Sequence, residues 1–208
     1  MTGPLSESTD VGAHRRRFEA MYDGDTALPW DRGGPNPVLA DWARGHRLDG
    51  TGRTALVIGC GLGGDSEFVA SLGFDTTAFD FVPAAIEETR RRYPDSRVDY
   101  SVANLLDPPA DWTGAFDFVL ESLTVQSLSR GLRGEAIDRV RSFIAPGGTL
   151  LVIAGMSDEA EPDDPNGPWP LTRTDIESFA TADLALLRLE TPPGIDNRPR
   201  WRVEFRCR

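Results

Sequence analysis

Short apolar runs alternate with amphipathic segments along most of this chain. Five runs with the pattern of buried strands occupy residues 54–58, 74–80, 97–102, 116–121 and 149–154. In the intervening segments 66–72, 83–92 and 132–144, apolar residues recur at the spacing of a helix. Apolar strands that alternate with such helices are typical of a parallel sheet covered on both faces. We therefore predict an α/β fold with a doubly wound, mainly parallel sheet and helices on both faces.

The two ends of the chain have patterns of their own. Residues 10–22 predict one N-terminal helix, and Asn36-Pro37 opens a second, as N-cap and first helical residue. After the fifth strand comes an acidic, proline-rich insertion over residues 157–170, followed by a predicted helix over 173–180. Residues 184–190 and 200–206 then alternate like an antiparallel pair. This pattern predicts a C-terminal antiparallel hairpin.

The first strand runs into a glycine-rich turn, Gly59-Cys60-Gly61-Leu62-Gly63-Gly64, which a helix follows. Glycine tolerates positive φ and lets a ligand approach the backbone, and a helix N-terminus offers unpaired N–H groups. The turn satisfies both Gly-x-Gly-x-Gly and the dinucleotide pattern Gly-x-Gly-x-x-Gly. It therefore predicts a site for the polar part of an adenosine-containing ligand, either a phosphate or the carboxylate of a methionine moiety. A turn that binds nothing is the alternative.

Polar residues stand at the ends of the next strands. Asp80 closes the second strand, 17 residues after Gly63, where a carboxylate would meet the hydroxyls of a ribose. Asn104 follows the third strand, and Glu121 ends the fourth. Because the carboxyl ends of parallel strands form the binding crevice of such a sheet, we expect these side chains and the glycine turn to meet there.

An unusual loop precedes the second helix. Its sequence, Leu28-Pro29-Trp30-Asp31-Arg32-Gly33-Gly34, places a tryptophan between a proline and two glycines. Two interpretations of Trp30 stay open. It is either an aromatic lid over a ligand or a core anchor for the N-terminal helix.

The charge of the chain argues against nucleic acid as a partner. Its 33 acidic and 22 basic residues give a net charge of −11, whereas phosphate backbones are held by clustered basic side chains. The arginine runs 15–17 and 90–92 lie among carboxylates in helical segments, and we interpret both as solvated faces. No apolar run approaches the roughly 18 residues that span a bilayer. Residues 1–11 show no signal-peptide core. We therefore expect no membrane partner and a cytoplasmic location.

Residue types that are missing or rare exclude several kinds of chemistry. All 22 Lys-or-Arg residues are arginine, so a P-loop, a pyridoxal or Schiff-base site and a tyrosine–lysine hydride-transfer site each lack their lysine. Two histidines, His14 and His46, and two cysteines, Cys60 and Cys207, make no metal-ligand spacing. We predict no metal site, and we interpret Cys60 as a small core residue.

Several motifs follow one another in order along the chain. They are Val57-Ile58-Gly59-Cys60-Gly61-Leu62-Gly63, Asp80, Asn104-Leu105-Leu106, Phe116-Asp117-Phe118-Val119, Pro146-Gly147-Gly148 and the final hairpin. With these motifs the chain resembles class I S-adenosylmethionine-dependent methyltransferases over about residues 18–206. Pro29-Trp30-Asp31, followed by Gly33-x-Pro35, resembles the small-molecule branch that contains thiopurine S-methyltransferases and the halide and thiol methyltransferases. The resemblance implies a Rossmann-like fold and S-adenosylmethionine as the cofactor.

The resemblance also implies a role for each residue of the predicted site. Gly59, Cys60, Gly61 and Gly63 would border the methionine part, Asp80 would bind both ribose hydroxyls, Phe81 and Leu105 would flank the adenine, Trp30 would close over the cofactor, and Glu121 would face the junction of cofactor and substrate. The family usually has an aspartate where Asn104 stands. The amide oxygen of Asn104 can also accept from the adenine amino group, without a charge. An indole face near a sulfonium is a cation–π arrangement worth roughly 0.5–2 kcal/mol.

The catalytic residues are not identified by any motif. Asp31, Glu121 and Gln126 are candidates for a general base by position, and Arg130 is a candidate for stabilising an anionic acceptor. Gln126 and Arg130 are explained equally well as polar surface groups. In-line transfer to a thiolate or halide needs no strong base, whereas an amine or hydroxyl usually does. The branch that the Trp30 loop resembles implies methyl transfer to a small soft nucleophile of the thiol or halide type.

Three alternatives stay open. In the first, the acceptor is a natural-product amine or hydroxyl. In the second, the chain binds the cofactor without catalysis, because a fold does not determine a function. A nicotinamide-dependent oxidoreductase shares the glycine pattern and the acid after the second strand.

We expect one methyltransferase domain over residues 1–208. Its parts would be a disordered segment 1–9, N-terminal helices and the tryptophan lid over 10–50, a cofactor-binding core over 51–155, an acceptor-side insertion over 156–171, and a helix with the hairpin over 172–208. Trp169, in the insertion, either walls the acceptor pocket or packs the insertion against the sheet.

Overall fold

The computed structural model describes residues 9–22, 28–157, 168–194 and 196–208. Most of the acceptor-side insertion, and all of the segment expected to be disordered except Thr9, lie outside these ranges. The strands are β1 (Thr54–Ile58), β2 (Asp75–Asp80), β3 (Asp99–Val102), β4 (Phe116–Ser122), β5 (Ile144–Gly155), β6 (Leu184–Glu190) and β7 (Arg200–Cys207). The helices are α1 (Thr9–Tyr22), α2 (Pro37–His46), α3 (Gly64–Ser71), α4 (Pro83–Arg92), α5 (Arg130–Ser142) and α6 (Arg173–Glu177), with 3-10 turns η1 (Ala110–Trp112) and η2 (Val125–Ser127).

All seven strands of the described residues form one sheet in the order β3-β2-β1-β4-β5-β7-β6. The first five run parallel to one another, whereas β7 is antiparallel to both β5 and β6. In the register, Ile58 of β1 stands between Phe79 of β2 and Glu121 of β4. These three strands therefore end at the same level. The predicted Rossmann-like sheet with its C-terminal antiparallel hairpin is confirmed.

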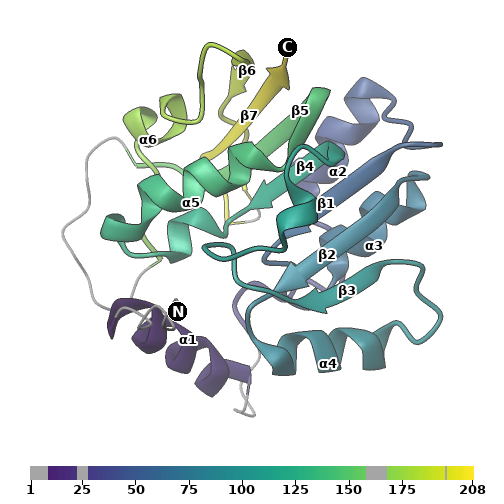
Figure 1. Ribbon diagram of the computed structural model, residues 1–208, viewed down its shortest axis with the longest axis vertical. Coiled ribbons are helices and arrows are strands. Elements are labelled where there is room, and N and C mark those ends of the chain that lie inside the picture. Colours follow the sequence, from purple (N-terminus) through teal and green to yellow (C-terminus); the bar gives the residue numbers. More distant parts are fainter. Residues whose placement is uncertain (1–8, 23–27, 158–167, 195) are drawn as a thin grey trace, which may run out of the picture.

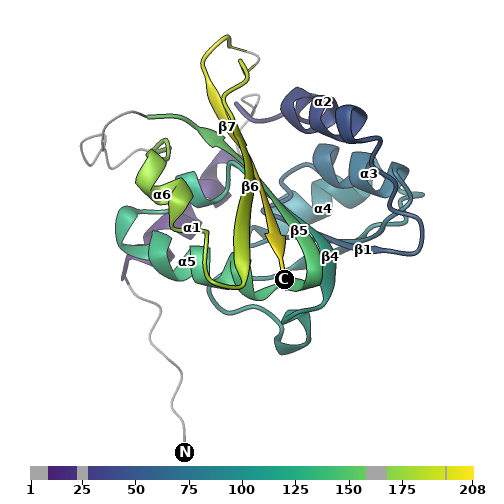
Figure 2. The same ribbon diagram turned by 90° about the horizontal axis from the view of Figure 1, so that it is seen from above.

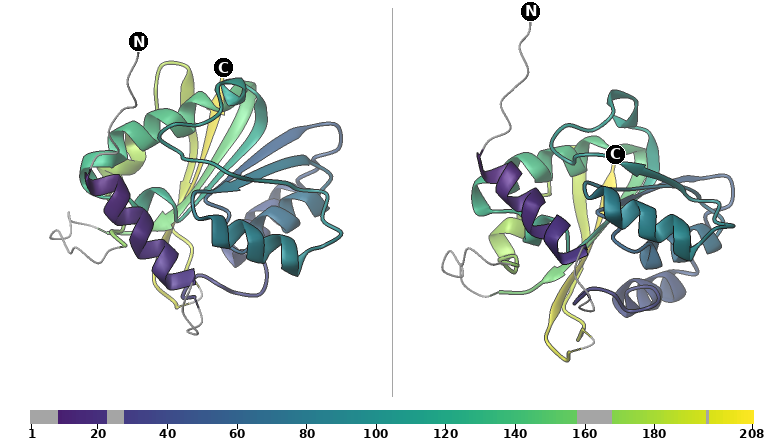
Figure 3. Two further views of the ribbon diagram at one scale, coloured as in Figure 1. Left: turned by 60° about the horizontal axis from the view of Figure 1, so that its bottom comes forward. Right: turned by 90° about the horizontal axis from the view of Figure 1, so that it is seen from below.

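Helices cover both faces of the sheet, as Figure 2 shows. One core contains the buried apolar side chains of α2, α3 and α4 against one face, among them Trp42, Val69 and Ile86. The other core contains Ile137 of α5 and Ile176 of α6 against the opposite face. Helix α1 belongs to neither layer. It lies across the end of the sheet at which the parallel strands terminate (Figures 1 and 3).

Side-chain caps begin two of the helices, and the cap predicted at Asn36 forms as expected. The side-chain oxygen of Asn36 accepts a hydrogen bond from the amide of Val38 at 3.1 Å, and Pro37 is the first residue of α2. Thr172 caps α6 in a reciprocal arrangement with Asp175. Such caps satisfy amide groups that a helix N-terminus leaves without an intrahelical partner.

Several helix boundaries differ from the predictions. The helix expected over residues 173–180 is α6, which ends at Glu177, and the helix expected over 66–72 is α3, which covers Gly64–Ser71. The helix expected over residues 132–144 is α5, which ends at Ser142, and Ile144 already belongs to β5. Ile144 pairs with Phe116, and the register of β4 and β5 shifts between Phe116 and Phe118. The Pro146-Gly147-Gly148 segment therefore lies within the irregular start of a strand. The helical periodicity of the sequence could not reveal this pairing, because it depends on a segment almost thirty residues earlier.

Candidate functional site

The glycine turn after β1 has the backbone conformation that its sequence predicts. Gly59, Gly61 and Gly63 all have positive φ, and at Gly61 it is 52°. Gly63 is the N-cap of α3, so the first amides of that helix border the turn. The backbone carbonyl of Gly61 accepts a hydrogen bond of 2.8 Å from Oγ1 of Thr89 on α4. A hydrogen bond from α4 therefore holds the turn in place.

Asp80 connects the end of β2 to this turn. Its side chain is 7% exposed, and its Oδ2 accepts from the amide of Gly61 at 3.0 Å. Its Oδ1 accepts from the amide of Val82, also at 3.0 Å. Burial raises the pKa of this carboxyl, and the backbone hydrogen bonds oppose that shift. Because each carboxylate oxygen has a second lone pair, Asp80 retains acceptor capacity for a diol beside the turn.

Aromatic side chains from α1 and the following loop cover the turn. A β-carbon on Gly61 would lie 3.5 Å from Nε1 and Cδ1 of Trp30 and 3.5 Å from the hydroxyl of Tyr22. The rings of Tyr22 and Trp30 have centroids 6.0 Å apart, and Phe18 lies 5.5 Å from Trp30. Burial, together with the nearby Asp80, raises the pKa of Tyr22. Trp30 thus contacts the glycine turn, as a cover would, and two side chains of α1, as an anchor for the N-terminal helix would.

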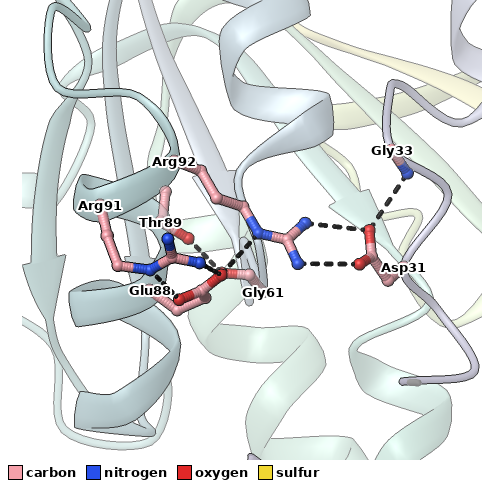
Figure 4. A network of polar contacts seen from close by, with 7 residues as sticks. All are labelled: Asp31, Gly33, Gly61, Glu88, Thr89, Arg91 and Arg92. Atoms are coloured by element: carbon pink, nitrogen blue, oxygen red, sulfur yellow. Dashed lines mark hydrogen bonds and ion pairs between the residues drawn. The ribbon is translucent and has the colours of Figure 1, made fainter.

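The loop that carries Trp30 is docked by polar contacts (Figure 4). Asp31 accepts hydrogen bonds on both carboxylate oxygens from Arg92 of α4, at 3.0 and 3.2 Å. The Arg92 guanidinium also donates to Glu88 at 2.8 Å. The hydrogen bonds from Arg92 lower the pKa of Asp31. The arginine run 90–92 is thus not only a solvated face, because Arg92 joins this loop to α4.

A small cavity brings together four of the predicted residues. Gly59, Phe81, Asn104 and Leu105 all line it. The remaining lining residues were not assigned to a site from the sequence; they are His14, Phe79, Leu106, Thr124, Ser127, Leu128 and Leu132. The ring of His14 stacks on that of Phe81 with a centroid distance of 5.4 Å and an interplanar angle of 14°. Helical spacing in residues 10–22 indicated that His14 and Phe18 share a face, but not which surface that face would meet.

Three polar side chains that line this cavity, those of Asn104, Thr124 and Ser127, make hydrogen bonds within the protein. Oδ1 of Asn104 accepts from the amide of Leu106 at 3.0 Å. Oγ1 of Thr124 donates to the carbonyl of Ile58 at 3.0 Å, and Oγ of Ser127 donates to the carbonyl of Thr124 at 2.7 Å. No carboxylate is among the described residues that line the cavity.

Glu121 is buried completely at the end of β4. Its Oε1 accepts from the amides of Thr124 and Val125, each at 2.8 Å, whereas Oε2 has no hydrogen-bond partner among the described residues. Burial raises the pKa of Glu121 to about 7, against the opposing effect of the two amide hydrogen bonds. Between Glu121 and Thr124, Leu123 has a positive φ of 66°, a conformation that non-glycine residues rarely adopt. The end of β4 is therefore both strained and able to hold a proton near neutral pH.

The other two predicted catalytic candidates lie elsewhere. Oε1 of Gln126 accepts from the amide of Gly155 at 2.5 Å, and the Gln126 carbonyl accepts from the amide of Trp169 at 2.8 Å. Arg130 lines a second cavity, between α5 and α6, and not the cavity beside Asn104. Trp169 is buried, and its carbonyl accepts from Arg133 at 2.6 Å. Gln126 and Trp169 thus fasten the segment after β5.

Comparison with known proteins agrees with this geometry. Residues 55–148 match the family model described as a methyltransferase domain. A ubiquinone biosynthesis O-methyltransferase of Xanthomonas campestris pv. campestris (strain B100) is 33% identical over 161 residues, which cover 72% of this chain and 64% of that protein. A homologue from Xanthomonas oryzae pv. oryzae (strain PXO99A) is 39% identical over 99 residues, 43% of this chain and 41% of that protein. The chain thus spans less than two thirds of the length of these relatives.

Solved structures share the fold. The 1,6-didemethyltoxoflavin-N1-methyltransferase of Burkholderia thailandensis, with bound 1,6-didemethyltoxoflavin and S-adenosylhomocysteine, has a TM-score of 0.77 at 17% identity and covers 100% of this chain and 93% of its own. None of the described helices is long and apolar enough to cross a membrane. Residues 55–148 thus match a methyltransferase domain, and the fold of the chain is similar to that of a solved methyltransferase.

Proposed function

We propose that this chain transfers the methyl group of S-adenosylmethionine to a small-molecule acceptor. The observation that carries the proposal is the arrangement around Gly61, where Asp80 holds the turn at the end of β2 and Trp30 covers it. When bound, S-adenosylmethionine supplies an electrophilic methyl group on a positively charged sulfur. The protein aligns donor and acceptor and excludes water, which are its main contributions to an in-line displacement.

Each residue of the site has a proposed role in binding the donor. Asp80 accepts from the ribose hydroxyls with its free lone pairs, and Phe81 and Leu105 flank the adenine. Gly59, Cys60, Gly61 and Gly63 border the methionine part, and Asn104 accepts from the adenine amino group. The residues fit the donor, because Asp80, at the strand end where a ribose is recognised, accepts from the amide of Gly61 in the glycine turn, and a bare backbone faces Trp30 and Tyr22.

For the acceptor we propose a small soft nucleophile, a thiol or a halide. Asn104, Thr124 and Ser127, which line the cavity, already bond to backbone groups, and no carboxylate is among the described lining residues. A thiolate or halide needs no proton acceptor. A further structure with this fold, described as the conversion of a disulfide bond into a thioacetal group during echinomycin biosynthesis, has a TM-score of 0.74 at 21% identity and covers 93% of this chain and 91% of its own. The chemistry named there involves sulfur, which favours the thiopurine and thiol branch that the Trp30 loop resembles.

A hydroxyl acceptor is the second candidate. The similarity to ubiquinone biosynthesis O-methyltransferases favours it. A phenol or another hydroxyl needs a base near neutral pH, and the carboxyl of Glu121, with a pKa of about 7 and one oxygen without a partner among the described residues, is the group suited to that task.

One assay separates the two candidates. Purified protein is incubated with S-adenosylmethionine and matched pairs of acceptors, such as thiophenol and phenol or iodide and an aliphatic amine, and S-adenosylhomocysteine is measured. We expect turnover with the thiol or halide at a rate that follows the fraction of thiolate and is unchanged in Glu121→Gln. Turnover of phenol alone, lost in Glu121→Gln, would establish the second candidate.

Binding alone is tested by calorimetry with S-adenosylmethionine, S-adenosylhomocysteine and NAD. We expect both sulfur nucleosides to bind and NAD not to bind. Binding of NAD in their place would replace the proposal with a nicotinamide-dependent function. Donor binding without turnover of any acceptor in the panel would favour a cofactor-binding protein.

A further inference from the structure

The loop from Leu28 to Asn36, called here the Trp30 loop, meets the layer of α3 and α4 at three points. Asp31 pairs with Arg92 through two hydrogen bonds. The carbonyl oxygen of Gly34 lies 2.5 Å from where a β-carbon on Gly64 would stand, so only a glycine permits this approach. The amide of Asn36 donates to Oδ1 of Asp65 at 2.6 Å. Of these three contacts, the pair of Asp31 with Arg92 is the one nearest to Trp30, because Asp31 directly follows Trp30 in the sequence.

The last turn of α4 contacts both the floor and the cover of the donor site. The floor is the backbone of Gly61, and its carbonyl accepts a hydrogen bond from Thr89. The cover is Trp30, and Arg92 holds the adjoining residue, Asp31. Residues three apart in a helix lie on the same side of it. Figure 4 shows Thr89 directed to Gly61 and Arg92 extending to Asp31 from this turn. The spacing of floor and cover is therefore set by one rigid element.

We propose that Arg92 is a positioning residue, which holds Trp30 over Gly61 through Asp31 and thereby determines the affinity of the chain for the methyl donor. This inference rests on the proposed function, because it assumes that the donor binds at the glycine turn in contact with Trp30. It assigns to Arg92 no contact with the donor or with the acceptor.

The neighbouring arginine provides the contrast. Arg91 and Arg92 both donate to Glu88, at 2.7 and 2.8 Å. The Arg91 side chain is 74% exposed, whereas those of Arg92 and Asp31 are only 32% and 27% exposed. Two parallel N–H···O bonds set the orientation of a carboxylate as well as its distance, which a lysine cannot do. Partial burial leaves the pair open to some screening by salt, so its effect is moderate.

The central experiment compares Arg92→Gln with Arg91→Gln. Binding of S-adenosylhomocysteine is measured by calorimetry, and hydrogen exchange is followed in the peptide that covers residues 28–36. For Arg92→Gln we expect affinity about 5-fold weaker and faster exchange in that peptide, as the loss of a partly buried bidentate pair suggests. For Arg91→Gln we expect both quantities at the wild-type value. In turnover assays the KM for the donor should rise in Arg92→Gln while kcat and the KM for the acceptor stay unchanged.

Two further variants separate positioning from damage to α4. Asp31→Asn breaks the pair from the loop side without changing the helix, and it should reproduce the weaker donor binding and the faster exchange of Arg92→Gln. The double variant Asp31→Arg, Arg92→Asp restores a pair with exchanged charges and should recover part of the lost affinity. Equal behaviour of Arg91→Gln and Arg92→Gln would overturn the inference, and so would faster exchange in the loop with unchanged donor affinity. Failure of the wild type to bind either nucleoside would refute the proposed function instead, whereas an unchanged exchange rate in Arg92→Gln would refute the positioning role by itself.

Discussion

Gly61 donates the hydrogen of its backbone amide to Oδ2 of Asp80 across 3.0 Å. The first residue lies in the turn after β1 and the second ends β2, so this bond ties two neighbouring strand ends into one site. The side chain of Asp80 is nearly buried, and its second oxygen is bonded to Val82. A change at either residue is therefore expected to affect the binding of an adenosine-containing donor.

The first prediction concerns Asp80→Asn. An asparagine turns an NH₂ group toward one of the two backbone amides and loses an acceptor for the ribose, so donor affinity should fall by about 1–3 kcal/mol. Titration with S-adenosylhomocysteine measures this loss, and thermal melting checks that the variant folds. Asp75→Asn, at the exposed start of the same strand, is the control and should bind as the wild type does. Wild-type affinity in a folded Asp80→Asn would remove Asp80 from the site.

The second prediction concerns Gly61→Ala. Alanine at a φ of 52° is strained by about 1 kcal/mol or more, and its methyl group enters the space between the backbone and Trp30. Gly114→Ala is a matched control, because Gly114 has a φ of 65° with nothing within 4 Å of the added carbon and precedes the start of β4. Both variants should lose a similar amount of folding stability in denaturant titrations. Only Gly61→Ala should lose donor binding, and equal binding by the two variants would contradict the placement.

The third prediction uses the charge of the donor to test Trp30. An indole face beside a sulfonium stabilises S-adenosylmethionine by roughly 0.5–2 kcal/mol over a neutral ligand of the same shape. Trp30→Leu should therefore weaken S-adenosylmethionine more than S-adenosylhomocysteine, and Trp30→Phe should keep most of the difference. The measurement is the ratio of the two dissociation constants in each variant. A ratio that is the same in Trp30→Leu and the wild type would reduce Trp30 to an apolar cover.

The fourth prediction concerns Glu121 and pH. The folded protein holds the Glu121 proton up to a pKa of about 7, whereas the unfolded chain releases it near the ordinary value of 4.5. The folded state therefore binds more protons between these two values, and its stability should decrease as the pH rises from 4.5 to 7 and then level off. Glu121→Gln keeps an oxygen for the amides of Thr124 and Val125 and has no proton to lose. Between pH 5 and pH 8 it should lose about 1–3 kcal/mol less stability than the wild type in urea titrations. Parallel curves for the two proteins would show that Glu121 is ionised throughout.

Local patterns in the sequence were sufficient for the elements that form the sheet and for the polar residues at its carboxyl end. The strand that ends at Ile58, the acid at the end of β2 and the cap at Asn36 are all as predicted. These features depend on side-chain alternation, glycine at positive φ and capping within a few residues. Such properties belong to short segments, so the sequence carries them directly.

The cover of the site needed the tertiary structure. The sequence indicated an amphipathic helix over residues 10–22, but not that His14 would stack on Phe81 or that Tyr22 would meet Trp30 over Gly61. The run 90–92 reads as a solvated face, and only the fold shows that Arg92 reaches Asp31, 61 residues earlier. The position of β7 between β5 and β6 was likewise not contained in the alternation of the last two strands.

The amino-acid sequence by itself determined which segments become strands and helices and which polar residues stand at the strand ends, because each of these outcomes follows from neighbours along the chain. Only the tertiary structure decided which surfaces meet: the aromatic face of α1 on the glycine turn and the Trp30 loop on α4. It also decided that Glu121 is buried. Contacts between distant segments are selected by how well whole faces bury apolar area and pair their buried polar groups. That selection takes place only when all the elements are assembled.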